Sequence, residues 1–176
     1  MWFDAIGRRL PAPFLPGYDT LGTLRYLRTN PEIAGYDHSW FILTQRIIKK
    51  EFALSGSEQN PDITSGERKA FLRQRLLNKA APDPVEAFKK HGADFVVADR
   101  LEDLVAKMNA LTDEALLDPA EIRRQIEARD GQLTNPFSKD AQIQGIRNAR
   151  KSLSDRLGRV AAPHRILDPD AGPLIG

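Results

Sequence analysis

The sequence predicts an α+β fold in which helices predominate and a few short strands form a small sheet. Apolar residues recur at helical spacing in several segments, and the clearest stripe consists of Leu101, Leu104, Val105, Met108 and Leu111. Other apolar runs, at 40–42 and 95–97, are too short for helices and are rich in aromatic and β-branched residues. With 176 residues, of which 41% are hydrophobic and 28% charged, the chain has the composition of one globular domain.

The composition excludes several classes of function. The chain has 26 basic and 24 acidic side chains, and no basic run is interleaved with aromatic residues, so a nucleic-acid partner is not expected. It has no cysteine, which excludes disulfides and thiolate metal sites. His38, His91 and His164 are scattered, which argues against a metal site. No apolar run reaches transmembrane length and no signal peptide is evident, so we expect a cytoplasmic protein without a membrane span.

The N-terminal segment predicts a hairpin, an extended passage and a helix. Residues 2–4 and 8–10 flank a short turn, as in a hairpin. Three prolines between positions 11 and 16 then favour an extended chain. Asp19 is a good N-cap for a helix over 20–28, whose leucines and Tyr26 share one face.

The segment 38–62 combines a buried strand, a helix and a polar loop. Residues 39–43 predict the strand, and 45–54 predict a helix with Ile47 and Ile48 on its apolar side. The loop that follows is a candidate substrate-binding segment, because functional side chains often lie on loops fixed by a rigid scaffold; its residues are Ser55, Gly56, Ser57, Glu58, Gln59 and Asn60. The alternative is a solvated loop whose serines and asparagine serve turns and caps.

The second half of the chain is mostly helical. Asp99 and Glu102 stand at capping-box spacing before the stripe at 101–111, and Asp118 followed by proline starts a helix carrying Ile122 and Ile126. The other expected elements are helices over 66–78, 84–90 and 140–157, a strand within 93–98, and a strand-like run at the C-terminal end. That run and the N-terminal hairpin suggest a piece of a longer chain.

No nucleotide-binding or hydrolase motif is present. The twelve glycines never form G-x-G-x-x-G or a Walker loop, so this chain carries no recognisable phosphate cradle. The serines do not form G-x-S-x-G. The pattern around Asp19 favours a helix cap over a catalytic acid or base.

Three stretches carry a resemblance to a known family. These are W-F-D-A-I-G-R-R-L-P-A-P-F-L-P-G-Y-D-T-L-G-T-L at 2–24, S-W-F-I-L-T-Q-R-I-I-K-K-E-F-A-L-S-G-S-E-Q-N-P-D at 39–62, and N-P-F-S-K-D at 135–140. They resemble FAD-binding dehydrogenases of the fumarate reductase/succinate dehydrogenase flavoprotein superfamily, which also contains the 3-ketosteroid Δ1-dehydrogenases. Residues 92–104 also fit the superfamily's strand-then-helix unit, though less specifically.

The resemblance implies that residues 1–176 are a single cap domain excised from a longer flavoprotein and lacking its Rossmann-like flavin domain. FAD would be bound mainly by the part of the parent outside this chain, and that flavin-binding domain and a small-molecule substrate would be the partners. The parent would transfer a hydride between a carbon–carbon bond next to a carbonyl and the flavin, while the isolated chain would be inactive and colourless. The alternative is a stand-alone, non-catalytic binding or interaction domain.

The resemblance also implies catalytic roles for Tyr18 and Asp19. Fumarate-reducing members place a proton-donating arginine, followed by an aspartate, at the corresponding helix start. Tyr18 stands in the arginine's place, and a neutral phenol can pass a proton but cannot offset the charge of a dicarboxylate. This implies a less charged, steroid-like substrate and no fumarate reduction. Alternatively, Tyr18 only packs over the helix start while Asp19 caps it.

Overall fold

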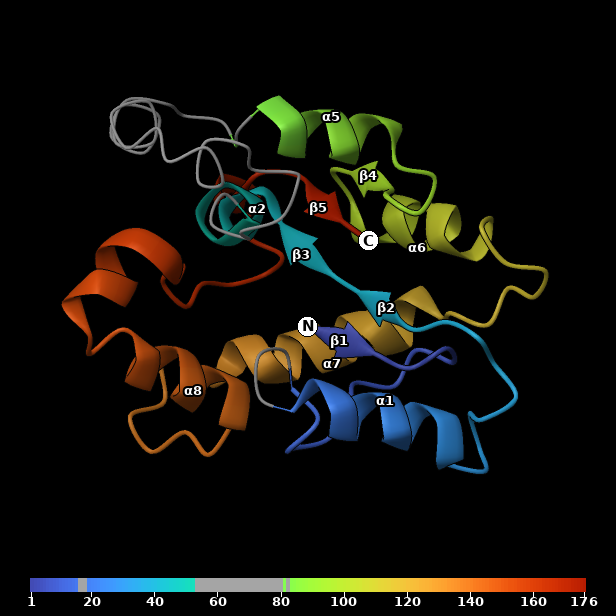
Figure 1. The fold of residues 1–176 in the computed structure, drawn as a ribbon, viewed down its shortest axis with the longest axis horizontal. Coiled ribbons are helices and arrows are strands. Elements are labelled where there is room, and N and C mark those ends of the chain that lie inside the picture. The colour runs from blue at the N-terminus through green and yellow to red at the C-terminus, as the bar shows by residue number, and fades with distance from the viewer. Residues whose placement is uncertain (16–18, 53–80, 82) are drawn as a thin grey trace.

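The computed structural model describes residues 1–15, 19–52, 81 and 83–176. They confirm an α+β fold in which helices predominate (Figure 1). The α-helices are α1 (Thr20–Thr29), α2 (Gln45–Glu51), α5 (Asp83–His91), α6 (Leu101–Asn109), α7 (Pro119–Gly131) and α8 (Ala141–Ala149). A π-helix, η2 (Asp155–Arg159), and a 3-10 helix, η3 (Pro169–Ala171), follow α8. The strands are β1 (Trp2–Phe3), β2 (Trp40–Phe41), β3 (Leu43–Thr44), β4 (Val97–Ala98) and β5 (Leu174–Ile175).

The short strands form two small antiparallel sheets. In the first, β1 pairs with β2, so that Trp2 lies opposite Phe41 and Phe3 opposite Trp40. In the second, β5 lies between β3 and β4 in the order β3-β5-β4. The run 40–44 belongs to both sheets, and the buried Ile42 separates its two strands. This run therefore links the part of the molecule formed by α1, α7 and α8 to the part formed by α2, α5 and α6 (Figure 1).

The N-terminal hairpin is confirmed. Phe3 pairs with Arg9 in an antiparallel bridge, and the backbone N–H of Leu10 donates to the carbonyl of Trp2 at 2.9 Å. The Asp4 side chain closes the turn by accepting the backbone N–H groups of Ile6 and Arg8. This hairpin presents β1 to β2 and so fixes one wall of the site described below.

The main core forms where α6 packs on α7 beneath the two sheets. The predicted stripe on α6 is buried at Leu101, Leu104, Val105 and Met108, but its last member, Leu111, lies beyond the end of the helix and is exposed. Ile122 and Ile126 of α7 are buried as well. A second core cluster joins α2 to α5 and β5 through Ile48, Ala81, Val85 and Ile175. Helical periodicity thus identified most of the helical core correctly.

The start of α6 and the face of α1 differ from the sequence prediction. The N-cap of α6 is Arg100, and it makes no side-chain capping bond, so the capping box of Asp99 and Glu102 is wrong. The Glu102 carboxylate instead pairs with Arg123 of α7, and more distantly with Arg100, so it takes part in ion pairs and not in a capping box. On α1 the leucines share a face, but Leu21 is 81% exposed and the buried residue of this helix is Thr23.

The helix expected over 140–157 is shorter than predicted. Asp140 is its N-cap, with its carboxylate accepting the N–H of Ile143, and α8 ends at Ala149. Beyond it the Ser152 hydroxyl contacts the Ser154 hydroxyl and accepts the N–H of Asp155. Such local side-chain bonds compete with helical backbone bonds. The expected helix over 66–78 lies outside the described residues, as do the last residues of the helix expected over 45–54.

Gly172→Ala should destabilise the protein strongly, although the substitution adds only one methyl group. Gly172 has φ 82° and ψ −174° just before β5, a conformation that is essentially limited to glycine and costs other residues about 1–3 kcal/mol. A Cβ there would also lie 2.7 Å from the Cβ of Gln45. Urea denaturation measures the loss. Gly35→Ala is the control, because a Cβ at Gly35 meets no atom within 4 Å; equal stability of the two variants would contradict the prediction.

Candidate functional site

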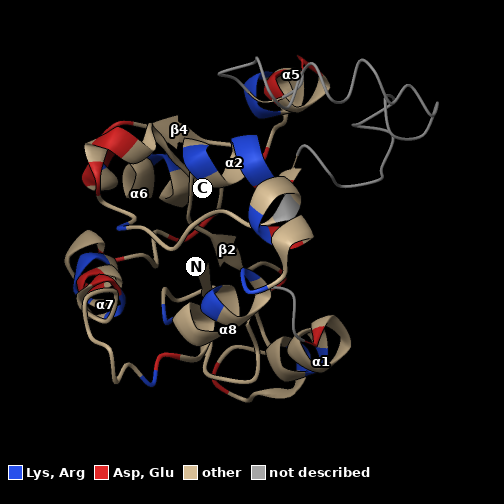
Figure 2. Cartoon of the chain, turned by 90° about the vertical axis from the view of Figure 1, so that its left-hand side faces the viewer, with Lys and Arg blue, Asp and Glu red and all other residues tan. Residues whose placement is uncertain are grey.

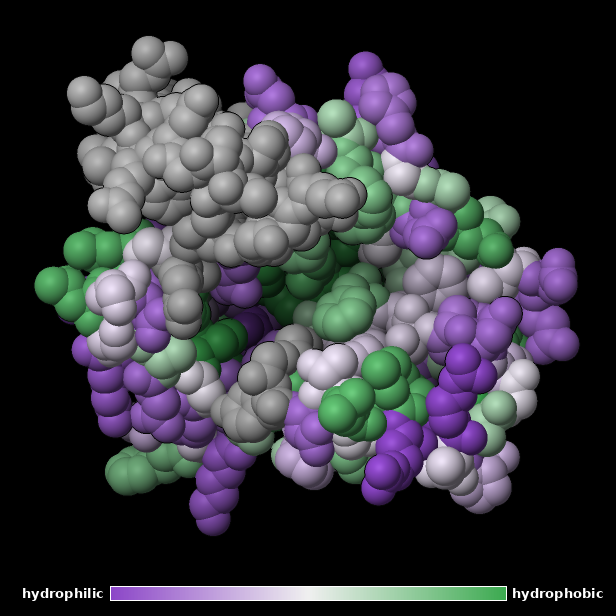
Figure 3. Space-filling view, in the orientation of Figure 1, coloured by the Kyte–Doolittle hydropathy of each residue, from purple (hydrophilic) through white to green (hydrophobic). Residues whose placement is uncertain are grey.

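A cavity of about 1080 Å³ opens between the two parts of the described molecule. Figure 3 shows it as a hollow near the centre of one face, with apolar residues at its base. Its apolar lining comes from β2, β3, α2, α8 and the chain around β4 and β5, and includes Trp40, Phe41, Leu43, Ile47, Phe52, Phe95, Ile146, Val160, Ile166 and Ile175. Its polar lining includes His38, Ser39, Glu51, Asp94, Thr112, Arg129 and Gln142.

The aromatic wall of the cavity follows from the alternation of side chains along β2. Trp40 faces the core and is 8% exposed, whereas Phe41 points the other way and is 37% exposed. Phe41 stacks on Trp2 of the neighbouring strand, with ring centroids 4.7 Å apart. On the far side, Phe95 packs edge-on against Phe88 of α5. The cavity therefore offers rigid, flat apolar surfaces.

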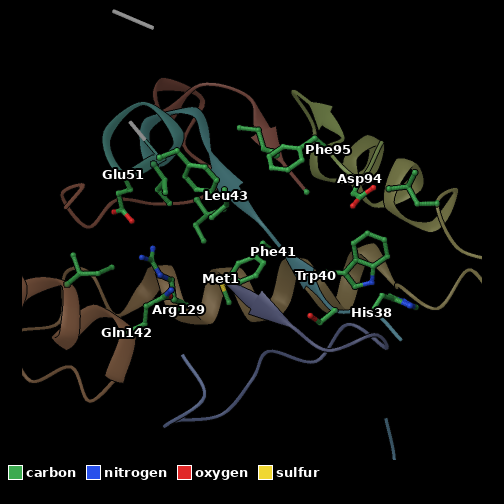
Figure 4. Close-up of a pocket in the computed structure, with 18 of the residues that line it drawn as sticks. Met1, His38, Trp40, Phe41, Leu43, Glu51, Asp94, Phe95, Arg129 and Gln142 are labelled. Carbon is green, nitrogen blue, oxygen red and sulfur yellow. The ribbon is translucent and has the colours of Figure 1, made fainter. Parts of the chain in front are cut away.

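The polar end of the cavity is organised by Arg129 (Figure 4). This residue of α7 is 5% exposed, and its Nη1 donates to Asp130 Oδ1 at 2.8 Å and to the carbonyl of His164 at 2.5 Å. The second oxygen of Asp130 accepts the N–H of Ile166 at 2.8 Å. The Arg129 Nε–H is buried without a hydrogen-bond partner. Buried donors without a hydrogen-bond partner are unusual in folded proteins.

Two further polar side chains lie at the same end in Figure 4: Glu51 of α2 and Gln142 of α8. Burial raises the pKa of the Glu51 carboxyl, and the hydrogen bond that it accepts from the N–H of Ala161, at 3.0 Å, acts in the opposite direction. Glu51 is an exposed residue at the cavity surface, and a carboxyl that faces a cavity and has a raised pKa is a candidate for proton transfer.

The opposite end of the cavity carries Trp40 and His38. The indole N–H of Trp40 is buried and has no hydrogen-bond partner. His38 lies edge-on to Trp40, with ring centroids 5.2 Å apart, and its Nδ1 lies 3.1 Å from a carboxylate oxygen of Asp37. Behind the lining at each end thus lies a shielded N–H group that no described residue accepts, and the walls between the two ends are apolar.

His164 supports the Arg129 end from behind. Its Nδ1 must donate to the carbonyl of Ala162, at 2.8 Å, because a carbonyl oxygen only accepts. Its Nε2 therefore accepts the hydroxyl of Thr44 at 2.8 Å when the ring is neutral. Burial lowers the pKa of His164, which favours that neutral form. Both ring nitrogens of His164 are thus hydrogen-bonded, which fixes the residue so that its backbone carbonyl can accept the hydrogen bond from Arg129 Nη1.

Of the residues that the sequence singled out for function, the structure describes only Asp19. Its carboxylate accepts the N–H of Gly22 at 2.8 Å, so the predicted helix cap is confirmed. Asp19 is exposed and is not among the described residues that line the cavity. Tyr18 and the loop Ser55–Asn60 lie outside the described residues, so their roles stay predictions.

Sequence reasoning missed Arg129, Glu51 and Gln142. For Arg129 a signal existed, because it stands three positions after Ile126 and seven after Ile122 and therefore lies on the buried face of α7. A cation on an apolar stripe is unusual enough to single out. Glu51 and Gln142 carry no comparable signal.

The described residues contain neither a metal site nor a membrane span. Within 1–15, 19–52, 81 and 83–176, acidic and histidine side chains nowhere gather in a group that could hold a metal ion. No helix of this described part has the length and apolar character needed to cross a bilayer. Figure 2 shows Lys and Arg interspersed with Asp and Glu on the described helices, without a large face of one sign.

FAD does not fit the described residues as a complete site. A dinucleotide normally lies across parallel strands, with its phosphates at a glycine-rich turn before a helix. Here all paired strands of the described part are antiparallel. Among the described elements, β3 leads directly into α2, and the start of this helix is capped by Thr44, whose hydroxyl accepts the N–H of Ile47. Any flavin would need a cradle from another part of a longer protein.

Comparison with known proteins finds relatives along nearly the whole chain. It is 54% identical over 175 residues to a KsdD-like steroid dehydrogenase of Mycolicibacterium smegmatis. It is 51% and 50% identical, over the same length, to KsdD-like steroid dehydrogenases of two Mycobacterium tuberculosis strains. These matches cover 99% of this chain but only 30–31% of the relatives, so the chain spans about a third of their length. No family model and no solved structure matches. The predicted resemblance to steroid dehydrogenase-like proteins is confirmed.

Proposed function

We propose that this chain is the substrate-covering cap of an FAD-dependent, steroid dehydrogenase-like oxidoreductase. The parent enzyme would transfer a hydride between a carbon–carbon bond next to a carbonyl and the flavin. The cap would bind the body of the substrate, orient it and exclude water. A cytoplasmic location, as the sequence predicts, is part of the same proposal.

The observation that carries this proposal is the large, aromatic-walled cavity. Ligand pockets commonly measure about 300–1,000 Å³ and are mainly apolar, with a few polar groups that fix orientation. A cavity of about 1080 Å³ with flat apolar walls and polar groups near its ends suits a rigid polycyclic molecule. The names of the relatives, which are steroid dehydrogenases, point to the same class of substrate.

The 176-residue chain should fold but bind no FAD stoichiometrically. The reason is that its described strands are antiparallel and its sequence has no glycine-rich phosphate loop. Visible absorbance of the purified chain, and titration with FAD, measure this. A protein of the relatives' length that contains this chain is the positive control, and it should carry FAD and oxidise or reduce a 3-ketosteroid. A stoichiometric yellow complex of the isolated chain, or a longer protein without flavin, would contradict the proposal.

The catalytic and substrate-binding assignments are part of this proposal. Tyr18 would lie in the proton path with Asp19 holding the start of α1, and the loop Ser55–Asn60 would contact the substrate. The alternative, a stand-alone binding domain without chemistry, would be favoured if the longer protein carried neither flavin nor dehydrogenase activity.

A further inference from the structure

We infer that the Arg129 end of the cavity binds an uncharged, hydrogen-bond-accepting oxygen of the substrate, and so fixes which way round an elongated apolar molecule lies. This inference rests on the proposed function and adds to it an anchoring residue and the chemistry of the group it holds.

The first argument is that one edge of the Arg129 guanidinium is held rigidly by the protein. Nη1 is engaged by the Asp130 carboxylate and by the carbonyl of His164. Asp130 is held in turn by the N–H of Ile166. Because these contacts come from the C-terminal segment as well as from α7, the guanidinium has little freedom to turn. A donor fixed in this way is preorganised for a ligand.

The second argument is that the other edge has no protein partner. Nε is buried and unpaired, and no described residue accepts a hydrogen bond from Nη2. Leaving a buried donor unsatisfied normally costs about 1–3 kcal/mol. Arg129 lines the cavity. Because Nε is shielded from solvent, Nη2 is the atom of this edge that a molecule in the cavity can meet.

The third argument concerns charge and selects an uncharged oxygen over a carboxylate. Asp130 neutralises Arg129 at 2.8 Å, and the nearby Arg9 is paired with Asp140 at 2.6 Å. Glu51, which faces the same end, adds either no charge or a negative one. The Met1 amino group also lines the cavity, and burial, with Arg129 and Arg9 nearby, lowers its pKa to about 5, so it is neutral at pH 7. No net positive charge is therefore left to offset a carboxylate, and burying an unpaired carboxylate is costly. A ketone or hydroxyl oxygen accepts the hydrogen bond without that cost.

The fourth argument is the shape between the two ends. Phe41 and Leu43 line the cavity between Arg129 and Trp40 (Figure 4). His38 and Ser39 line the far end of the cavity, whereas the indole N–H of Trp40 there is shielded from it. A molecule with an apolar body and an oxygen at each end matches this arrangement. Bonds to a charged donor are roughly twice as strong as bonds to a neutral one, so Arg129 is the main anchor.

The test compares ligands that differ by one oxygen. Androst-4-ene-3,17-dione and the two steroids that each lack one of its ketones are titrated into the 176-residue chain. The signal is the fluorescence of its two tryptophans, of which Trp40 lines the cavity. Loss of the ketone that meets Arg129 should weaken binding by about 10-fold or more.

The matched variants are Arg129→Lys and Arg124→Lys, on the same helix. Lysine keeps a charge for Asp130 but loses the second edge of the guanidinium, so the 10-fold discrimination should fall to about 3-fold or less. Arg124 is exposed and pairs with Glu121, so its variant should discriminate as the wild type does. If Arg129→Lys still discriminates between these steroids as the wild type does, or if the wild type does not discriminate, the inference is overturned while the proposed function stands.

A wild-type measurement covers the case in which Arg129→Lys does not fold. A 3-keto-4-ene steroid with a 17β-carboxylate should bind about 10-fold or more weakly than the dione, and equal or tighter binding would overturn the inference. If none of the steroids binds, the substrate class under the proposed function fails and the inference fails with it. If all bind equally, the proposed substrate class stands and only the Arg129 anchor fails.

Discussion

Asp130→Asn should lower the free energy of unfolding by about 3–5 kcal/mol, the usual result of breaking a buried ion pair from one side. The two carboxylate oxygens of Asp130 face two donors, Nη1 of Arg129 and the N–H of Ile166. Asparagine replaces one oxygen by an NH₂ group, so in either orientation a donor faces a donor. The Arg129 charge also loses its partner in a site where both side chains are more than 90% buried.

Urea denaturation followed by circular dichroism measures this loss. Asp118→Asn is the matched control, because it makes the same substitution on the same helix. Asp118 is the exposed N-cap of α7 and accepts the N–H of Ala120 at 2.9 Å. Asparagine is as good an N-cap as aspartate, so this variant should keep nearly wild-type stability. Asp130→Asn with the stability of Asp118→Asn would show that the ion pair does not hold α7 to the C-terminal segment.

Tyr18→Phe should slow steroid turnover by about 10²–10⁴-fold in the FAD-loaded protein of the relatives' length, the usual contribution of a general acid or base. The substitution keeps the ring and removes only the hydroxyl that the proposal places in the proton path. Substrate binding and the melting temperature should change little, because phenylalanine keeps the aromatic ring. Turnover under saturating substrate, with the melting temperature beside it, measures the effect.

Tyr36→Phe is the control for this substitution. Tyr36 is half-buried, packs edge-on to His38, and is not among the described residues lining the cavity, so its variant should turn over at the wild-type rate. Glu51→Gln tests the competing proton-transfer group that the structure reveals. Wild-type turnover in Tyr18→Phe together with slow turnover in Glu51→Gln would move the role from Tyr18 to Glu51. Efficient reduction of fumarate would also contradict the proposed role of Tyr18.

Local patterns in the sequence determined the helices and much of the core. The stripe on α6, the aspartate caps of α1, α7 and α8, and the N-terminal hairpin need only contacts between residues close in the chain. The same patterns failed where a distant partner competed. Glu102 forms an ion pair with Arg123 and does not take part in a capping box. The leucines of α1 share a face, but the core does not cover that face.

The candidate site was decided by tertiary structure, because its residues come from every part of the chain. Trp40 and Glu51 precede Gln142 by about a hundred residues, and Arg129 becomes an anchor only where the C-terminal segment brings the carbonyl of His164 to it. The sequence shows each of these side chains and the pairing tendency of each strand. It does not show which faces meet, since spacing records only the order along the chain. The pairing of β5 with β3 and β4, and the position of α2 opposite α7 and α8 across the cavity, turned separate polar residues into one site.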